Sequence, residues 1–222
     1  MGASRCSVVI VIGGGPLERP PGAGRPGHDT PFDLVIAADS GYDAALAASF
    51  APTHLVGDLD SISDAGREHA EQHGVVLHRH PADKEATDTA LAVALALDLG
   101  ATELTVFGPA DAGRLDHLLG SIAVLGEPRL AGCTSVTAHT AGASLHVIHP
   151  GRPQRLALTP HCTFSLLALH GDCGGVDLSG ATWNLTDADL SATRSLGISN
   201  VALGPITVRS RTGVLTVVAA RP

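Results

Sequence analysis

Apolar and helical segments alternate over the first 125 residues, and this alternation limits the possible folds more than any other feature of the chain. Five short segments rich in Val, Ile and Leu predict buried strands. They lie at residues 8–12, 34–38, 54–56, 75–78 and 103–107. Segments of helical character lie between or after them, at residues 42–50, 63–73, 87–99 and 114–125. Such alternation is typical of a mostly parallel sheet with helices on both faces, so we expect a Rossmann-like α/β domain.

The pattern changes after residue 150. Residues 154–222 hold short alternating runs with many Thr and Ser residues and Gly turns, and they contain no compelling helix of more than two turns. This pattern is typical of a small antiparallel sandwich or barrel. We therefore expect an α/β domain over residues 1–150 and a small all-β sandwich over residues 151–222.

The composition narrows the possible partners. The 22 acidic and 14 basic residues give a net charge of −8, which speaks against binding to nucleic acid or to an anionic membrane surface. The apolar run at residues 8–12 is too short to cross a membrane. The 4 cysteines form no C-x-x-C pair, as is usual for thiols in a reducing compartment. We expect a cytoplasmic protein.

Acidic residues follow each predicted strand of the first domain except the first strand. In an open parallel sheet, ligands bind beyond the carboxyl ends of the strands, so these side chains are expected to converge on one crevice. They are Asp39, Asp58, Asp60, Asp83, Asp88, Asp111 and Asp116.

Asp58 and Asp60 are the strongest candidates for a metal site. In an extended segment their side chains point to the same side, and Asp88 at a helix start supplies a third carboxylate. Carboxylates at this density suit Mg²⁺, which takes few protein ligands together with substrate phosphates. The alternative is a turn in which the Asp side chains accept hydrogen bonds from backbone N–H groups.

Two basic residues lie beside these acids. Lys84, the only lysine of the chain, directly precedes a predicted helix, and Arg114 opens the next one together with Asp116. A cation at these places can neutralise phosphate charge, and a helix N-terminus favours anions. The alternative for both is pairing with neighbouring acids on the surface. For Trp183, the only tryptophan, the default alternative is a place in the core.

Five ordered blocks resemble the thiamin pyrophosphokinase family. They are ADSG at residues 38–41, GDLDSI at 57–62, DKEATD at 83–88, GRLDH at 113–117, and GATWNLT at 180–186 followed by Leu190, Ser199 and Asn200. The chain departs from the family pattern at residues 110–112, where a glycine pair is frequent, and in the Pro- and Gly-rich segment 16–31.

The resemblance implies an N-terminal α/β domain, a C-terminal β-sandwich and a homodimer with its sites at the subunit interface. The implied reaction is the Mg²⁺-dependent transfer of a pyrophosphoryl group from ATP to the hydroxyethyl oxygen of thiamine, which gives thiamine diphosphate and AMP. Thiamine and ATP are then the small-molecule partners, and neither nucleic acid nor a membrane is expected.

The resemblance also assigns the site residues. The metal ligands would be Asp58, Asp60 and Asp88, which with Lys84 and Arg114 make up the catalytic set. The nucleotide side would comprise Asp39, Ser40, Gly41, Thr87, Asp116 and His117. The thiamine side would comprise Trp183, Ser199 and Asn200. Two alternatives stay open: a pyrophosphokinase that acts on another primary alcohol, such as a hydroxymethyl pterin, and an inactive module that binds a nucleotide or thiamine.

Overall fold

A computed structural model describes residues 5–17, 32–83, 85–109 and 114–220. The chain divides into two compact units. The first unit comprises residues 1–124, 132–134 and 138–141, and the second comprises residues 125–131, 135–137 and 142–222. None of the helices in the described ranges is long and apolar enough to cross a membrane.

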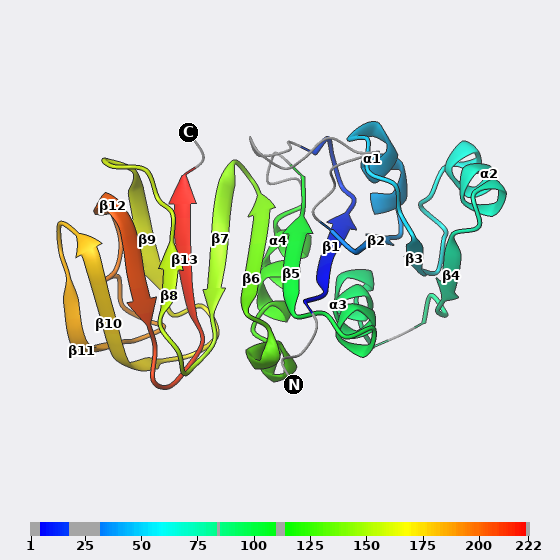
Figure 1. Ribbon diagram of the computed structural model, residues 1–222. Coiled ribbons are helices and arrows are strands. Elements are labelled where there is room, and N and C mark those ends of the chain that lie inside the picture. Colours follow the sequence, from blue (N-terminus) through cyan, green and yellow to red (C-terminus); the bar gives the residue numbers. More distant parts are fainter. Residues whose placement is uncertain (1–4, 18–31, 84, 110–113, 221–222) are drawn as a thin grey trace. The chain divides into compact units, whose positions relative to one another are not determined.

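The first unit alternates strands and helices, as the sequence predicts (Figure 1). Its strands are β1 (Ser7–Ile12), β2 (Leu34–Ala38), β3 (His54–Gly57), β4 (Val76–Arg79), β5 (Glu103–Phe107) and β6 (Ser135–Thr140), the last of which is shared with the second unit. Its helices are α1 (Gly41–Ala47), α2 (Asp64–Gln72), α3 (Asp88–Asp98) and α4 (Leu115–Val124). A 3-10 turn, η1 (Pro128–Gly132), precedes β6.

The sheet of the first unit has the order β4-β3-β2-β1-β5-β6. The β1–β2, β1–β5, β2–β3 and β3–β4 pairs are all parallel, so the parallel sheet predicted for this part of the chain is confirmed. β1 lies in the middle and is buried along its whole length, with Val8, Val9, Ile10 and Val11 at 0% exposure. This burial on both faces explains its continuous β-branched sequence.

The second unit is antiparallel, and its described part contains no α-helix. Its strands are β7 (Ala143–Ile148), β8 (Gln154–Leu156), β9 (Thr163–Leu167), β10 (Cys173–Ala181), β11 (Leu185–Leu190), β12 (Asn200–Arg209) and β13 (Leu215–Ala220). They follow the order β11-β10-β12-β9-β13-β7, and β8 pairs with β12. One apolar cluster, which includes Ile148, Phe164, Ile206 and Leu215, forms its core. Taken over the whole chain, the sheet is therefore mixed rather than mostly parallel.

The division between the units falls earlier in the chain than residue 150. β7 pairs with β13 over the whole length of both strands, from Ile148 opposite Leu215 to Ala143 opposite Ala220. Because these backbone hydrogen bonds join β7 to the C-terminal strand, β7 belongs to the second unit although it precedes residue 150.

Candidate active site

The turn after β2 places Asp39 at the carboxyl edge of the parallel sheet. Ala38 pairs with Val56, and the Asp39 N–H donates to the Val56 carbonyl at 2.8 Å, so Asp39 lies beside the end of β3. Asp39 has a φ of 46°, a left-handed conformation that is uncommon for a residue with a side chain. The backbone then enters α1 at Gly41, where a β-carbon would overlap the Val11 carbonyl oxygen.

The turn after β3 carries the second and third carboxylates. Gly57 and Leu59 both have a positive φ, of 147° and 66°, so the chain changes direction at two points. The Asp58 Oδ1 atom accepts a hydrogen bond from the Asp60 N–H at 3.2 Å, and the Ser61 hydroxyl donates to Asp60 Oδ1 at 2.8 Å. One oxygen of Asp58 thus accepts a hydrogen bond from a backbone N–H group, as in the turn that the sequence analysis considered as the alternative to a metal site.

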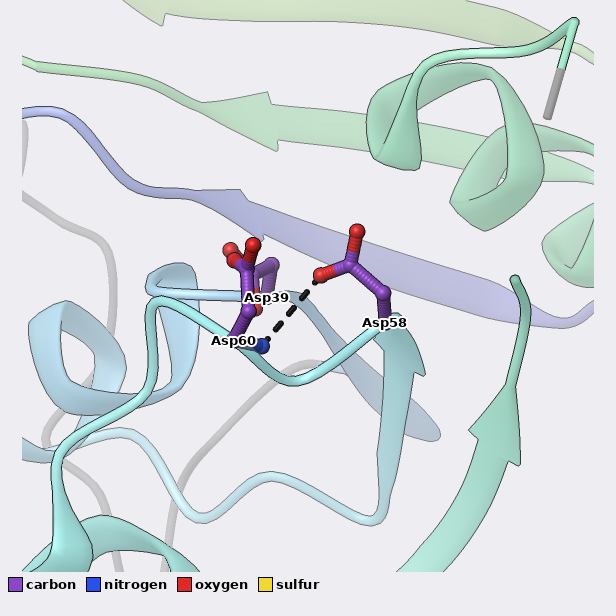
Figure 2. Close-up of side chains that lie close together, drawn as sticks. All are labelled: Asp39, Asp58 and Asp60. Atoms are coloured by element: carbon purple, nitrogen blue, oxygen red, sulfur yellow. Dashed lines mark hydrogen bonds between the residues drawn. The ribbon is translucent and has the colours of Figure 1, made fainter. Parts of the chain in front are cut away.

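Asp39, Asp58 and Asp60 form one carboxylate group, with one oxygen from each within 4.8 Å of the others (Figure 2). Asp39 is only 9% exposed, Asp58 is half-buried and Asp60 is exposed. The buried Oδ1 atom of Asp39 accepts no hydrogen bond from the described residues. Three clustered carboxylates, one of which also has a buried oxygen without a donor among the described residues, are the kind of donor set that suits a hard cation such as Mg²⁺.

The electrostatics of Asp39 agree with this interpretation. Burial raises the pKa of the Asp39 carboxyl, and the negative charge of Asp88 raises the same pKa further. The neighbouring polar groups of Ser61 and the Ser40 backbone lower the pKa of Asp39 and offset part of the shift. A bound cation would remove the repulsion between these acids.

Asp88 lies close to this group, although it is not one of the three carboxylates that gather within 4.8 Å. It opens α3, whose N-cap is the Thr87 hydroxyl, which accepts from the Ala90 N–H at 3.2 Å. A β-carbon at Gly57 would lie 3.1 Å from Asp88 Oδ1 and 3.1 Å from the Asp39 β-carbon. In the structure Asp39 clusters with Asp58 and Asp60, and Asp88 lies beside them. The sequence analysis had placed Asp39 on the nucleotide side.

A cavity of about 670 Å³ opens next to Asp39 in the first unit. Seven of the predicted site residues line it: Asp39, Ser40, Thr87, Asp88, Arg114, Asp116 and His117. Gly13 and Gly14, at the end of β1, also line it. A β-carbon at Gly13 would overlap the Ser40 hydroxyl, so a glycine keeps the backbone close to the turn after β2.

The cavity also includes residues that the sequence analysis missed. Ser61 belongs to the GDLDSI block and was within reach of motif reasoning, whereas Thr140 comes from β6 and carries no signal in the sequence. Thr140 Oγ1 donates to the Pro109 carbonyl at 3.2 Å. Thr89 and Ser121 complete the missed polar set, with their hydroxyl oxygens 3.4 Å apart.

Arg114 and Asp116 form an ion pair at the cavity. Arg114 Nη2 lies 2.6 Å from Asp116 Oδ2, and the side chains are 70% and 65% exposed. The hydrogen bond from Arg114 lowers the pKa of Asp116. The surface pairing considered for these residues is therefore present, and it lies in the cavity wall. Lys84, Asp111 and Gly113 lie outside the described residues.

The predicted thiamine-side residues lie together in the second unit. Trp183 follows β10 and is 60% exposed, so the default expectation of a core tryptophan is wrong. Asn200, the first residue of β12, is buried with 6% of its surface exposed, and its side chain is bonded to the Trp183 backbone. Ser199 is exposed and has a φ of 61°.

Fold and site together define a class of protein. A parallel sheet with a cavity and clustered carboxylates beyond its strand ends is the arrangement of α/β proteins that bind a small ligand at that edge. Here the site is acidic and suited to a cation, and an antiparallel unit with an exposed tryptophan follows it along the chain.

The comparison with known families gives the particular family. Residues 30–136 match the model described as "Thiamin pyrophosphokinase, catalytic domain", and residues 146–215 match "Thiamin pyrophosphokinase, vitamin B1 binding domain". The chain thus belongs to the thiamin pyrophosphokinase family, as its sequence blocks predicted.

Individual relatives agree with this assignment. The thiamine pyrophosphokinase of Bacillus subtilis (strain 168) is 34% identical over 117 residues, which is 53% of this chain and 53% of that protein, so the match spans about half of its length. The crystal structure of a Bacillus subtilis thiamine pyrophosphokinase superposes with a TM-score of 0.75 at 23% identity, covering 96% of this chain and 99% of that one. Thiamin pyrophosphokinase from Candida albicans gives 0.74 at 14% identity, covering 97% and 89%. At these identities the structural matches show a shared fold.

Proposed function

We propose that this protein is a thiamine diphosphokinase that transfers a pyrophosphoryl group from ATP to the hydroxyethyl oxygen of thiamine and releases AMP. The observation that carries the proposal is the carboxylate group of Asp39, Asp58 and Asp60 beside a cavity, in a chain that belongs to this family. Transfer of a phosphoryl group depends mainly on charge neutralisation and on in-line placement of the reactants, which such a site can supply.

The residues fit a resident Mg²⁺. Asp58 and Asp60 would hold it, with Asp39 or Asp88 as the further carboxylate, because Asp39 gathers with them and Asp88 lies beside Asp39. When bound, Mg²⁺ supplies positive charge against the phosphate oxygens.

The chain's own groups would orient the nucleotide in the cavity. The backbone at Gly13 and Gly14 gives close access to a phosphate, and the N-terminus of α3 at Asp88 carries partial positive charge. Arg114 would donate to phosphate oxygens once it leaves Asp116, and Asp116 and His117 would contact the nucleoside part. Ser40, Gly41 and Thr87 shape the turns, and Lys84 is proposed as a further phosphate ligand.

Trp183 and Ser199 would bind thiamine. The exposed indole offers a flat face to the aminopyrimidine and a cation–π partner to the thiazolium ring. The exposed Ser199 hydroxyl can hydrogen-bond a polar edge of the ring. An acidic protein also favours a cationic acceptor electrostatically.

Three further features belong to the proposal. The second unit is a sandwich in which β12 is shared. Its first two residues pair with β9, residues 206–208 pair with β8, and β10 pairs with it between Ala202 and Arg209, around one core. The protein is a homodimer with its sites at the subunit interface, as in the family it resembles. It works in the cytoplasm, where ATP is available and the 4 cysteines stay reduced.

The test is an incubation of the purified protein with ATP, Mg²⁺ and thiamine, followed by chromatography of AMP and thiamine diphosphate. We expect both products in equal amounts, and neither without thiamine. Turnover by the Asp60→Ala variant is expected to disappear while its circular dichroism spectrum stays that of the wild type. AMP formation with a hydroxymethyl pterin but not with thiamine would identify the pterin as the acceptor substrate. Binding of Mg-ATP without any product would indicate an inactive module.

A further inference from the structure

Trp183 is held in an unusual position for a large aromatic side chain. It is the only tryptophan, it lies two residues after Ala181, the last residue of β10, and 60% of its surface is exposed. An exposed side chain gains little from packing, so the direction of the indole depends on how its backbone is held. The groups that fix this backbone therefore decide where the indole lies.

One buried side chain binds the Trp183 backbone at both of its polar groups. The Trp183 N–H donates to Asn200 Oδ1 at 3.2 Å, and Asn200 Nδ2 donates to the Trp183 carbonyl at 2.7 Å. Asn200 Oδ1 also accepts from the Val201 N–H at 2.8 Å. Two N–H donors on one atom and a carbonyl on the other identify the oxygen and the nitrogen of the amide.

These bonds leave Asn200 little capacity for a ligand. An Asn side chain has two donor hydrogens and two acceptor lone pairs, and three of these four are used within the protein. The residue is only 6% exposed. Its carboxamide is thus directed to the backbone of the loop that carries the indole.

The neighbouring chain fixes this direction. The Thr182 N–H donates to the Val201 carbonyl at 2.9 Å, so the loop that carries Trp183 is bonded to β12 next to Asn200. Ser199 has a φ of 61°, and its N–H donates to the Ser165 hydroxyl at 3.1 Å. This left-handed turn leaves Ser199 exposed and directs Asn200 inward.

We infer that Asn200 is a positioning residue that holds the Trp183 indole in place for the ligand, in contrast to the direct thiamine contact expected from the sequence. The inference rests on the proposed function, which makes the indole the stacking surface for thiamine. Ser199 keeps its place as the polar contact, while Asn200 acts only through Trp183.

The substitution Asn200→Asp tests this inference with almost no change of shape. One carboxylate oxygen can still accept from the Trp183 and Val201 N–H groups. The other replaces the Nδ2 donor and faces the Trp183 carbonyl, which is 2.7 Å from Nδ2 in the wild type. The ionised form therefore repels this carbonyl, whereas the protonated form can donate to it again. The variant thus breaks this hydrogen bond where the carboxyl is ionised, at about pH 8, and restores it to the extent that acidification protonates the carboxyl.

Two readouts follow the change. Because Trp183 is the only tryptophan, its emission maximum, anisotropy and acrylamide quenching report its position without any need for activity. We expect Asn200→Asp to differ from the wild type in all three at about pH 8 and to approach it at about pH 5. Steady-state kinetics at the higher pH should show a KM for thiamine raised about tenfold, with the KM for ATP changed less than about twofold.

The controls use the same part of the molecule. Asn184→Asp is the matched change, because Asn184 Oδ1 accepts from the Ala181 N–H at 3.1 Å and a carboxylate keeps that bond. Its tryptophan signals should follow the wild type at both pH values. Each variant is compared with the wild type at the same pH, which cancels the effects of pH on the parts of the protein that the variants share with the wild type.

The outcomes separate the possible roles. Wild-type tryptophan signals of Asn200→Asp at both pH values would overturn the positioning role. A raised KM for thiamine with unchanged tryptophan signals would also overturn it, because Asn200 would then contact the ligand directly. If no thiamine diphosphate forms even with the wild type, the proposed function fails, while the fluorescence comparison still decides whether Asn200 holds Trp183.

Discussion

Asp39 and Asp88 are two acids beside one glycine at the carboxyl edge of the sheet. Burial raises the pKa of Asp39, and the charge of Asp88 adds to this shift. A β-carbon on Gly57 would lie 3.1 Å from the Asp39 β-carbon and 3.1 Å from Asp88 Oδ1. The space around Gly57 thus separates two carboxylates, and a bound cation would relieve the repulsion between them.

We predict that Asp39→Asn stabilises the protein in the absence of Mg²⁺ and abolishes stabilisation by Mg²⁺. The change keeps the shape of the side chain and removes one of the repelling charges. Thermal unfolding with EDTA should show a Tm raised by roughly 2–4 °C, the shift that about 1 kcal/mol gives in a chain of this length. Added Mg²⁺ should raise the Tm of the wild type and of Glu68→Gln, an exposed change on α2, but leave that of Asp39→Asn unchanged. A normal Mg²⁺ response of Asp39→Asn would exclude Asp39 from the cation site.

We predict that Gly57→Ala lowers turnover about 100-fold, because the added methyl group displaces Asp39 or Asp88. Gly100→Ala is the matched control: Gly100 also has a positive φ, of 87°, but a β-carbon there meets nothing within 4 Å. Both variants lose stability through backbone strain, of about 1–2 kcal/mol for a left-handed residue. Only Gly57→Ala should lose turnover at a temperature where both are folded, and equal turnover of the two would show that the space at Gly57 is irrelevant.

We predict that Trp183→Ala raises the KM for thiamine at least tenfold, on the order of the stacking and cation–π energy lost, and changes the KM for ATP less than about twofold. Because the indole is 60% exposed, the Tm should stay close to that of the wild type. Leu203→Ala removes another exposed apolar side chain, at 61% exposure, and serves as the control for general surface effects. Equal changes in both KM values would assign Trp183 a structural role.

We predict a loss of stability in mild acid that involves His149. Burial lowers the pKa of this ring below its ordinary value of 6.5, and the charge of His170 lowers it further, while the hydrogen bond to the Leu125 carbonyl opposes the shift. As the pH falls through 6.5, the His149 ring binds a proton in the unfolded chain but stays neutral in the folded protein, where its pKa is lower. The folded protein is therefore fully stabilised above this pH and loses stability as the pH falls through it.

The measurement is the urea midpoint of wild type and His149→Gln on both sides of this pH. The Gln side chain keeps an N–H donor for the Leu125 carbonyl but does not titrate. We expect acidification to lower the urea concentration at the unfolding midpoint more for the wild type than for the variant. An equal loss in both proteins would assign the acid sensitivity to other groups, among them His54 and His146, whose pKa values burial also lowers.

Several features could be predicted from the sequence because they depend on local pattern. The β-branched run in β1 is buried on both faces, and the Thr87 hydroxyl caps α3 as the capping rules require. Asp39, Asp58, Asp60 and Asp88 reach one edge of the sheet because parallel neighbours end on the same side. The blocks around Asp39, Asp58 and Trp183 also sufficed to identify the family.

Tertiary structure alone decided which of these residues meet. The register that sets Ala38 opposite Val56 brings Asp39 to Asp58 and Asp60, a pairing across two strands that spacing along the chain cannot encode. Thr140 reaches the cavity only because β6 lies beside β5, and Trp183 is exposed although apolar side chains are usually buried. The local sequence pattern therefore sufficed to predict the elements, the acidic edge of the sheet and the family. Which carboxylates share a site, and that Asn200 turns inward to the Trp183 backbone, followed from long-range hydrogen bonds that form only in the folded chain.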